Sequence, residues 1–261
     1  MLKGGIFLDV ENLTRNGGYG MRFRAVKNLV EAQGVTVLRA NAYMAYDIDE
    51  ERSDNIYRTA KQEYRNRLHR EGFHLVLKEV QRYQNPDGTT TTKANADLDL
   101  AVDALLQSDN LDYILLGTGD GDFLRLVRAL QSRGKRVDLL SFANTSGALR
   151  REVDFHFSGF LMPGILPPSQ DVVNLYRGIM HGVNEERGFG FLTIQTGLDP
   201  GAARDDIFLH ISDFSTANGM PVSNEAFARL KTRGAIIEFE LVEQDDGRPK
   251  AQFAREFAPV R

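Results

Sequence analysis

Residues 113–123 read Tyr-Ile-Leu-Leu-Gly-Thr-Gly-Asp-Gly-Asp-Phe, a short apolar run that ends in Asp120 and Asp122. Such a run, followed directly by glycine, is typical of a buried strand in a parallel sheet. A second apolar run at residues 6–8 also ends in an aspartate, Asp9. Ligands of open α/β sheets bind at the carboxyl ends of the strands. The two stretches therefore predict a mostly parallel sheet with acidic side chains at one edge.

The rest of the first 160 residues alternates between strand-like and helix-like segments. Predicted strands lie at residues 6–10, 35–43, 73–80, 113–116 and 136–142, and predicted helices lie at 22–33, 51–71, 95–106 and 122–133. Gly34, Gly72 and Gly134 follow three of these helices, as glycine does at helix C-termini. This alternation predicts an α/β domain whose sheet is covered by helices on both faces. Residues 83–92 contain Asn-Pro-Asp-Gly, which predicts a hairpin or flap before Lys93.

The pattern changes near residue 160, where prolines and glycines accumulate. This change predicts a domain at residues 1–160, a linker at 161–170 and a second domain at 171–261. In the second domain, short strands are expected at 177–183, 190–194, 206–210, 236–241 and 251–254, with one helix at 224–230. About 90 residues with five short strands predict a small all-β barrel.

The composition narrows the chemistry that the chain can perform. It has 261 residues and no cysteine, which excludes disulfides, thiolate metal sites and a cysteine nucleophile. Its five histidines are scattered along the sequence, so carboxylates must carry most of any catalytic chemistry. No apolar run approaches the roughly 18 residues of a membrane helix, so we expect a cytoplasmic protein without a membrane partner.

The net charge of −4 argues against a basic clamp for nucleic acid. Residues 1–160 hold 22 Lys+Arg and 22 Asp+Glu, and residues 161–261 hold 10 and 14. Neither half is basic, so nucleic-acid binding would have to use local patches and base stacking. Homo-oligomerisation is left open by the sequence.

Asp97 is a candidate site residue because of its position on the predicted helix 95–106. At 100° per residue, apolar side chains surround Asp97, whereas Asp99 and Asp103 fall together on a polar face. A buried aspartate needs a partner or a function. The alternative is that Asp97 only interacts with the helix dipole at the first turn.

Asp120 and Asp122 are suited to a hard cation, which prefers oxygen ligands. A dinucleotide-binding loop is disfavoured, because the third glycine is misplaced and two aspartates would repel a pyrophosphate. Helix capping is the alternative role for this pair.

Asn12 could orient a phosphate or a metal-bound water, or act only as a turn residue; Glu11 is a further candidate carboxylate. Lys93 could bind phosphate or be a solvated lysine.

Four carboxylates in one cleft would repel one another, and divalent cations would remove that repulsion. Such a site can ionise water and stabilise an in-line phosphoryl displacement. The sequence therefore suggests metal-dependent chemistry on a phosphate ester, with Asp9, Asp97, Asp120 and Asp122 as the ligands.

Three motifs, Asp9-x-x-Asn12, Lys93-x-x-x-Asp97 and residues 118–123, resemble the NYN domains of the LabA (DUF88) group in the PIN-like nuclease superfamily. The resemblance covers about residues 1–160 and implies a PIN-like fold and a ribonuclease that depends on Mg²⁺ or Mn²⁺. The family's acidic positions fall on Asp9, Asp97, Asp120 and Asp122. Two departures are a Lys93–Asp97 spacing one residue longer than usual and a threonine, Thr118, where the family carries serine.

In the second domain, aromatic side chains are expected on one outward face of adjacent strands by strand alternation. They are Phe189, Phe191, Phe208 and His210, with Arg187 as a phosphate contact. Exposed aromatics on a small barrel stack on unpaired bases. The alternative, that these phenylalanines are core, is disfavoured because Gly188 and Gly190 would leave the strand poorly packed unless another group approached.

Residues 175–258 resemble a cold-shock domain, an OB-fold barrel, through residues 187–191 and 206–210. The resemblance implies binding of single-stranded RNA. Where the family carries Lys-Trp-Phe, this chain has His181-Gly182-Val183, so a stacking tryptophan is absent. The loop 196–204 is also longer than in compact members.

Three functions follow from these observations. The first is a metal-dependent ribonuclease whose second domain binds single-stranded RNA. The second is a non-catalytic RNA-binding regulator. The third is a haloacid-dehalogenase-like phosphatase, which is disfavoured because its Asp-x-Asp-x-Thr motif is replaced by residues 9–13, Asp-Val-Glu-Asn-Leu.

Overall fold

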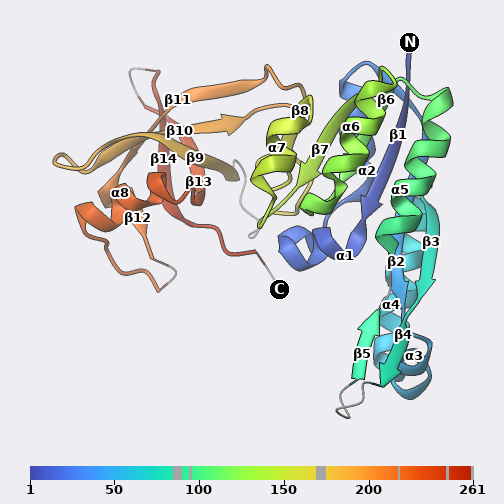
Figure 1. Ribbon diagram of the computed structural model, residues 1–261. Coiled ribbons are helices and arrows are strands. Elements are labelled where there is room, and N and C mark those ends of the chain that lie inside the picture. The colour runs from blue at the N-terminus through green and yellow to red at the C-terminus, as the bar shows by residue number, and fades with distance from the viewer. Residues whose placement is uncertain (85–89, 94–95, 169–174, 217, 245–246, 260–261) are drawn as a thin grey trace. The chain divides into compact units, whose positions relative to one another are not determined.

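The chain divides into two compact units, Met1–Ser158 and Gly159–Val260. A computed structural model describes residues 1–84, 90–93, 96–168, 175–216, 218–244 and 247–259, without the side chains of Tyr83 and of residues 90–93. Each unit contains its own large sheet (Figure 1). Within the described ranges, no helix has the length and apolar character needed to cross a membrane.

A parallel sheet of six strands forms the centre of the first unit. In spatial order the strands are β3 (His74–Glu79), β2 (Val35–Tyr46), β1 (Leu2–Asp9), β6 (Tyr113–Gly117), β7 (Arg136–Ser141) and β8 (Phe155–Ser158). All neighbouring strands pair in parallel. The chain runs outward from β1 through β2 and β3, and later through β6, β7 and β8, so the strand order reverses between β1 and β6. Ligands of open α/β sheets bind at such a reversal.

Helices cover both faces of this sheet, as the sequence predicted. They are α1 (Val10–Leu13), a π-helical turn (Thr14–Gly18), α2 (Phe23–Ala32), α3 (Ile48–Ser53), α4 (Asn55–Arg70), α5 (Ala96–Gln107), α6 (Leu124–Ser132) and α7 (Gly147–Glu152), with 3₁₀ turns at Ser108–Asn110 and Gly121–Phe123. Phe7 and Leu116 share one core with α5, α6 and α7. Side chains alternate along a strand, so Gly4 of β1 faces the opposite layer, toward Val30 of α2.

Two local features differ from the sequence prediction. The helix expected at 51–71 is divided into α3 and α4, because Asp54 adopts extended geometry and caps α4 by accepting the N–H groups of Ile56 and Tyr57. The segment α7–β8 was not predicted. The expected hairpin is present as β4 (Gln81–Gln84) paired antiparallel with β5 (Thr90–Lys93), and its turn at 85–89 lies outside the described residues.

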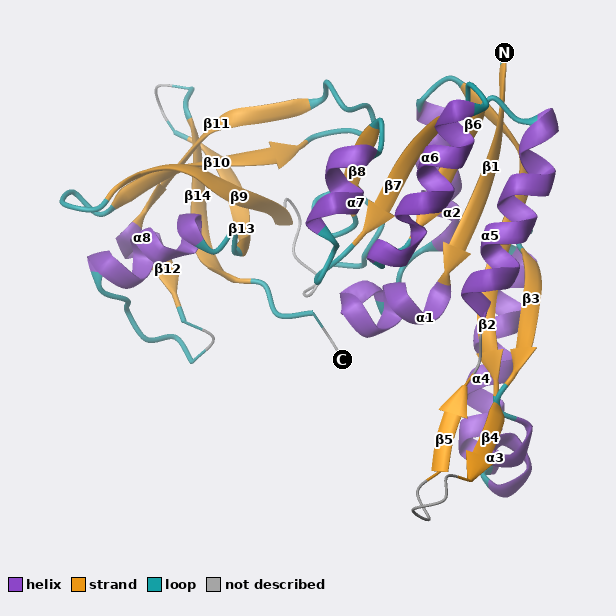
Figure 2. Cartoon of the chain, viewed as in Figure 1, coloured by secondary structure: helices purple, strands orange, loops and turns teal. Residues whose placement is uncertain are grey.

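The second unit contains a closed five-stranded β-barrel, which confirms the predicted all-β barrel (Figure 2). Its elements are β9 (Leu175–Asn184), β10 (Phe189–Gln195), β11 (Ala203–His210), a 3₁₀ turn (Ile211–Asp213), β12 (Phe214–Ser215), α8 (Asn224–Thr232), β13 (Ile236–Glu243) and β14 (Pro249–Glu256). The strands are ordered β11-β10-β9-β13-β14, and a β11–β14 pairing closes the barrel. This arrangement is consistent with an OB-like barrel. Phe227 and Leu230 of α8 complete its core.

Candidate functional site

Acidic side chains gather where the strand order of the first unit reverses. β1 ends at Asp9, and the loop after the neighbouring strand β6 carries Asp120. A hollow of about 180 Å³ at this edge is lined by Asp9, Glu11, Asn12, Arg15, Asn16, Tyr43, Ala45, Ala96, Asp97 and Asp120. Three of the four aspartates expected from the sequence therefore line one hollow, although they lie far apart in the chain. Asp122 does not line it.

Asp9 is the most buried of these carboxylates, with 8% of its surface exposed. It accepts hydrogen bonds from the backbone N–H of Asn12 at 3.0 Å and from the hydroxyl of Thr118 at 3.2 Å. Burial raises the pKa of Asp9 to about 6, and the charges of Asp97 and Glu11 act in the same direction. Burial is the dominant cause, since the hydrogen bonds from Asn12 and Thr118 favour the charged carboxylate and lower its pKa.

Asp97 lies in the first turn of α5 and is exposed, rather than surrounded by buried apolar residues as the sequence predicted. The buried face of α5 is formed by Leu100 and Ala104, whereas Leu98 and Val102 are exposed. The angular positions of the side chains identified the apolar side of the helix, but they did not identify which of its residues pack on the sheet. Although its side chain reaches solvent, the surrounding protein removes part of its hydration, and this desolvation, followed by the charges of Asp120, Asp122 and Glu11, raises the pKa of Asp97.

The other two aspartates of α5 also differ from their predicted solvated roles. Asp103 accepts a hydrogen bond from the hydroxyl of the buried Tyr43 at 2.9 Å, so it supports the core. Asp99 forms an ion pair with Lys78 of β3 at 3.0 Å. Both residues are therefore engaged in structural contacts, whereas Asp97 faces the hollow.

The loop after β6 is held in place by side chains of the site itself. Asp120 caps the 3₁₀ turn by accepting the N–H of Asp122 at 2.9 Å, so the capping role expected as an alternative is real for Asp120. The N–H of Asp120 donates to the Thr118 hydroxyl at 3.2 Å. Asn12 Oδ1 accepts the N–H of Gly119 at 2.7 Å. Asn12 and Thr118 thus position Asp120 beside Asp9.

Glu11 differs from the other carboxylates because its charge is compensated. It accepts the N–H of Ala45 at 3.3 Å and pairs with Arg15 at 2.9 Å. Arg15 was not anticipated, although its place four residues after Glu11 is the spacing of a helical ion pair. Lys93 ends β5, and its side chain lies outside the described part of the chain.

The hollow offers only oxygen ligands, which Mg²⁺ and Mn²⁺ prefer. Among the described residues, Asp9, Asp97 and Asp120 form no ion pair with a lysine or arginine, and the pKa of both Asp9 and Asp97 is raised. A divalent cation would supply the missing positive charge and would favour the ionised carboxylates. The three-carboxylate donor set therefore fits a divalent cation. In the same described ranges, no three Asp, Glu or His side chains are grouped closely enough to coordinate one ion. A cation bound here would therefore keep water among its ligands or draw the carboxylates together.

The aromatic residues of the second unit share one face of β10 and β11. Phe189 stands opposite His210, and Phe191 stands opposite Phe208. The three phenylalanine rings contact one another at centroid distances of 5.7–6.1 Å, and His181 of β9 stacks beside Phe191 at 6.4 Å. The alternate residues of these strands are buried: Leu192, Ile194, Ile207 and Leu209. The aromatic face is thus distinct from the core.

The structure explains why residues 188 and 190 are glycines, which the sequence argument did not. A Cβ at Gly190 would lie 2.7 Å from the carbonyl oxygen of Gly182 and 3.0 Å from the sulfur of Met180. Gly188 has a φ of +62° in the turn before β10. Close packing inside the barrel therefore accounts for Gly190, and the left-handed backbone of the turn accounts for Gly188, without a ligand. Arg187, in the same turn, is exposed and donates its backbone N–H to Asn184.

Comparisons with known proteins identify the first unit. The chain resembles a solved structure of a protein of unknown function from Vibrio parahaemolyticus, with 26% identity, coverage of 60% of this chain and 92% of that chain, and a TM-score of 0.48. No curated protein matches the chain. The family model described as the NYN domain matches residues 3–161, which include the parallel sheet and the acidic hollow. The chain therefore belongs to the NYN domain family, within the PIN-like nuclease superfamily.

Proposed function

We propose that this protein is a metal-dependent ribonuclease that hydrolyses phosphodiester bonds of RNA. The observation that carries the proposal is the convergence of Asp9, Asp97 and Asp120 from three separate segments on one hollow at the strand-order reversal. Membership of the NYN family supports nuclease activity. In this proposal those three carboxylates hold Mg²⁺ or Mn²⁺, and Asp122 adds negative charge from outside the hollow.

When bound, a divalent cation supplies a Lewis acid and lowers the pKa of a water molecule that can attack a phosphodiester. The protein's own contribution is to hold carboxylate oxygens in place without neutralising them. Thr118 and the backbone of Asn12 fix the two oxygens of Asp9. The side chain of Asn12 fixes the Gly119 backbone, and with it the start of the turn that presents Asp120.

The barrel is proposed to bind single-stranded RNA, in the manner of a cold-shock domain. Its support is the face formed by Phe189, Phe191 and Phe208, of which Phe191 is 38% exposed. Each base stacked on an aromatic ring contributes about 1–3 kcal/mol of binding free energy. His210, Arg187 and Lys93 are proposed as further RNA contacts, and the first unit is proposed to fall within the LabA (DUF88) group.

Cleavage of a labelled single-stranded RNA tests the proposed activity. The wild-type chain should cleave with Mg²⁺ or Mn²⁺ and stop when the ions are chelated, and Asp120→Asn should lose the activity while retaining a cooperative unfolding transition. Unchanged cleavage by Asp120→Asn would contradict the proposal. RNA binding without cleavage under either metal would instead support the non-catalytic RNA-binding regulator.

A further inference from the structure

Two larger hollows follow the acidic hollow along α4. The first, of about 570 Å³, shares Glu11, Arg15 and Ala45 with the acidic hollow and continues to Tyr57 and Lys61 of α4. The second, of about 430 Å³, lies further along both elements, between Tyr19 and Gly20 on one side and α4 on the other. Residues 11–20 and α4 contribute side chains to both hollows, which are together called the groove; the first hollow adjoins the acidic hollow, and the second shares no lining residue with the first.

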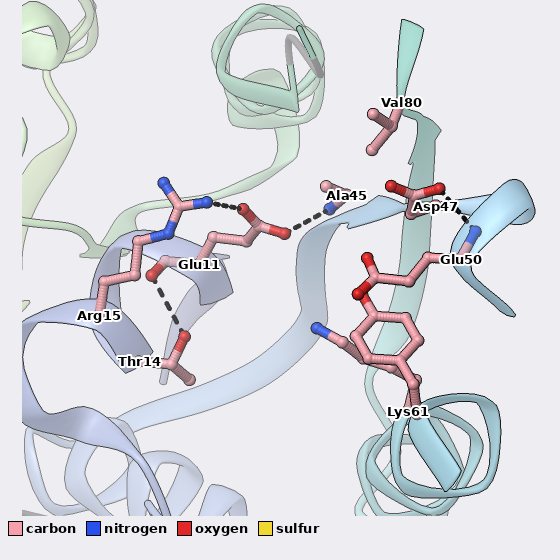
Figure 3. Close-up of a pocket in the computed structure, with 9 residues that line it drawn as sticks. Glu11, Thr14, Arg15, Ala45, Asp47, Glu50, Lys61 and Val80 are labelled. Atoms are coloured by element: carbon pink, nitrogen blue, oxygen red, sulfur yellow. Dashed lines mark hydrogen bonds and ion pairs between the residues drawn. The ribbon is translucent and has the colours of Figure 1, made fainter. Parts of the chain in front are cut away.

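Within the described part of the chain, four cations line this groove. Figure 3 shows Glu11, Thr14 and Arg15 on one side of the first hollow and Lys61 on the other, with its amino group extended toward the space between them. Among the described residues, Lys61 has no carboxylate within 4.0 Å, and its nitrogen lies 5.3 Å from the ring centroid of Tyr57. The side chain of Arg15 is 78% exposed and uses one nitrogen for Glu11. Arg67 and Arg70 line the second hollow.

Several acidic groups in the groove are already occupied. Asp47 pairs with Arg82 and caps α3 by accepting the N–H of Glu50, and Glu11 pairs with Arg15. With Arg15 already paired to Glu11, the exposed Glu50 and Glu63 are the other carboxylates of the two hollows, against the cations Lys61, Arg67 and Arg70. The groove can therefore accept an anionic chain, in contrast to the acidic hollow at its end.

Aromatic rings alternate with these cations. Tyr19 is 59% exposed at the second hollow. Tyr64 is held in place by an edge-on contact with Phe23 of α2, at a centroid distance of 5.7 Å. Tyr57 borders the first hollow. A groove that combines cations with aromatic rings is suited to a single nucleic-acid strand, because cations contact phosphates and rings stack on bases.

We propose that these two hollows form a track for single-stranded RNA that leads into the acidic hollow, with Lys61 and Arg15 contacting a backbone phosphate and Tyr19 stacking on a base. The proposal rests on the proposed function, because the acidic hollow is where the scissile phosphate would lie. It adds a substrate path through the first unit that is separate from the aromatic face of the barrel.

Binding of a fluorescein-labelled 12-nucleotide RNA, followed by fluorescence anisotropy, tests this track. The full chain carries Asp120→Asn to prevent cleavage and Phe191→Ala to weaken binding by the barrel. Lys61→Met should raise the Kd about fivefold in 0.1 M salt and reduce the slope of log K against log salt by about 0.7, the value for one phosphate contact on a single strand. Tyr19→Ala should raise the Kd about tenfold, and Tyr19→Phe should preserve affinity.

Lys3→Met is the matched control, since Lys3 is exposed at the opposite end of β1 from Asp9 and should leave both the Kd and the salt slope unchanged. Equal Kd values and slopes for Lys61→Met and Lys3→Met would overturn the track, as would a wild-type affinity for Tyr19→Ala. A wild-type chain that cleaves no RNA, with both variants weakened in binding, would contradict the ribonuclease but support the track. Cleavage without any effect of these variants on binding would contradict the track alone.

Discussion

Asn12 Oδ1 accepts a hydrogen bond from the backbone N–H of Gly119 at 2.7 Å. This contact joins the segment that follows β1 to the loop that follows β6, across the point where the strand order reverses. Asp9 precedes Asn12 by three residues, and Asp120 follows Gly119 directly. The side-chain amide of Asn12 therefore acts together with the Thr118 hydroxyl to set the spacing between two carboxylates of the candidate site.

Asn12→Ala should destabilise the protein, because the Gly119 N–H would lose its acceptor. Loss of a partner for a buried backbone group costs about 1–3 kcal/mol. We expect that decrease in the free energy of unfolding in urea, together with slower RNA cleavage. Asn28→Ala, at an exposed position of α2, should change neither quantity. Equal stability of the two variants would show that the amide does not hold the loop.

Asp9 should make the metal-free protein less stable as the pH rises. Its pKa of about 6 in the folded state lies above the ordinary value of 3.8, so the folded state binds this proton more tightly than the unfolded state. The stabilisation is fully present below about pH 4 and is lost as the pH rises through 6, a change of about 3 kcal/mol. Asp9→Asn should therefore be more stable than wild type at pH 8 without divalent ions.

Urea unfolding at pH 4 and pH 8 measures this effect. At pH 4 the stability advantage of Asp9→Asn should disappear, because the wild-type carboxyl is then protonated. Addition of Mn²⁺ at pH 8 should raise the stability of the wild-type chain more than that of Asp9→Asn. The same pH dependence in both chains would contradict this account of Asp9.

Asp103→Ala should lower stability by about 1–3 kcal/mol, since the hydroxyl of the buried Tyr43 would lose its acceptor. Asp103→Asn keeps an acceptor oxygen and should retain most of the stability. Asp99→Ala removes only a partly exposed ion pair with Lys78 and should cost less than about 1 kcal/mol. Thermal or urea unfolding of the three variants checks this order, and the reverse order would contradict the orientation of α5.

Gly182→Trp should increase the affinity of the barrel for single-stranded RNA. A Cβ at Gly182 would lie 3.9 Å from the ring of Phe191, which is an ordinary contact, so the position can accept a side chain beside the aromatic face. One added stacking ring should lower the Kd about tenfold. An unchanged Kd, measured by anisotropy, would show that bases do not bind beside Phe191.

Phe191→Ala should weaken RNA binding about tenfold with little loss of stability, because Phe191 is partly exposed. Phe253→Ala is a matched control, since Phe253 is 74% exposed on β14 of the same barrel and is not part of the aromatic face. Equal affinities of the two variants would argue against the aromatic face as the binding surface.

Much of the fold followed from local sequence features. Apolar runs ending in glycine or aspartate predicted the strands of the parallel sheet, and positive φ values at Gly34, Gly72 and Gly134 match the three predicted helix ends. The division of α3 from α4 was missed, since Asp54 has a capping side chain in a segment of otherwise helical composition. The Asp54 side chain competes with the helical backbone for the same N–H groups, and hydrophobic periodicity does not detect this competition.

The site was predictable in part. The order of the strands places Asp9 and Asp120 together, because both follow neighbouring parallel strands. The buried face of α5 was not predictable from a helical wheel, because it depends on which residues of the helix contact the sheet. Leu98 and Val102 lie on the apolar side of the wheel but are exposed. The Glu11–Arg15 ion pair required the helical turn Val10–Leu13, which was not predicted, since the strand was expected to continue to residue 10.

The most direct test of the central claim compares two aspartates on α5, only one of which lines the acidic hollow. Initial rates of cleavage of a single-stranded RNA are measured with Mn²⁺ for the wild type, Asp97→Asn and Asp99→Asn. Loss of a metal ligand should slow cleavage by Asp97→Asn at least about a hundredfold, and Asp99→Asn should stay close to the wild-type rate. A wild-type rate for Asp97→Asn, or equal losses in the two variants, would contradict the assignment of the acidic hollow as the catalytic site.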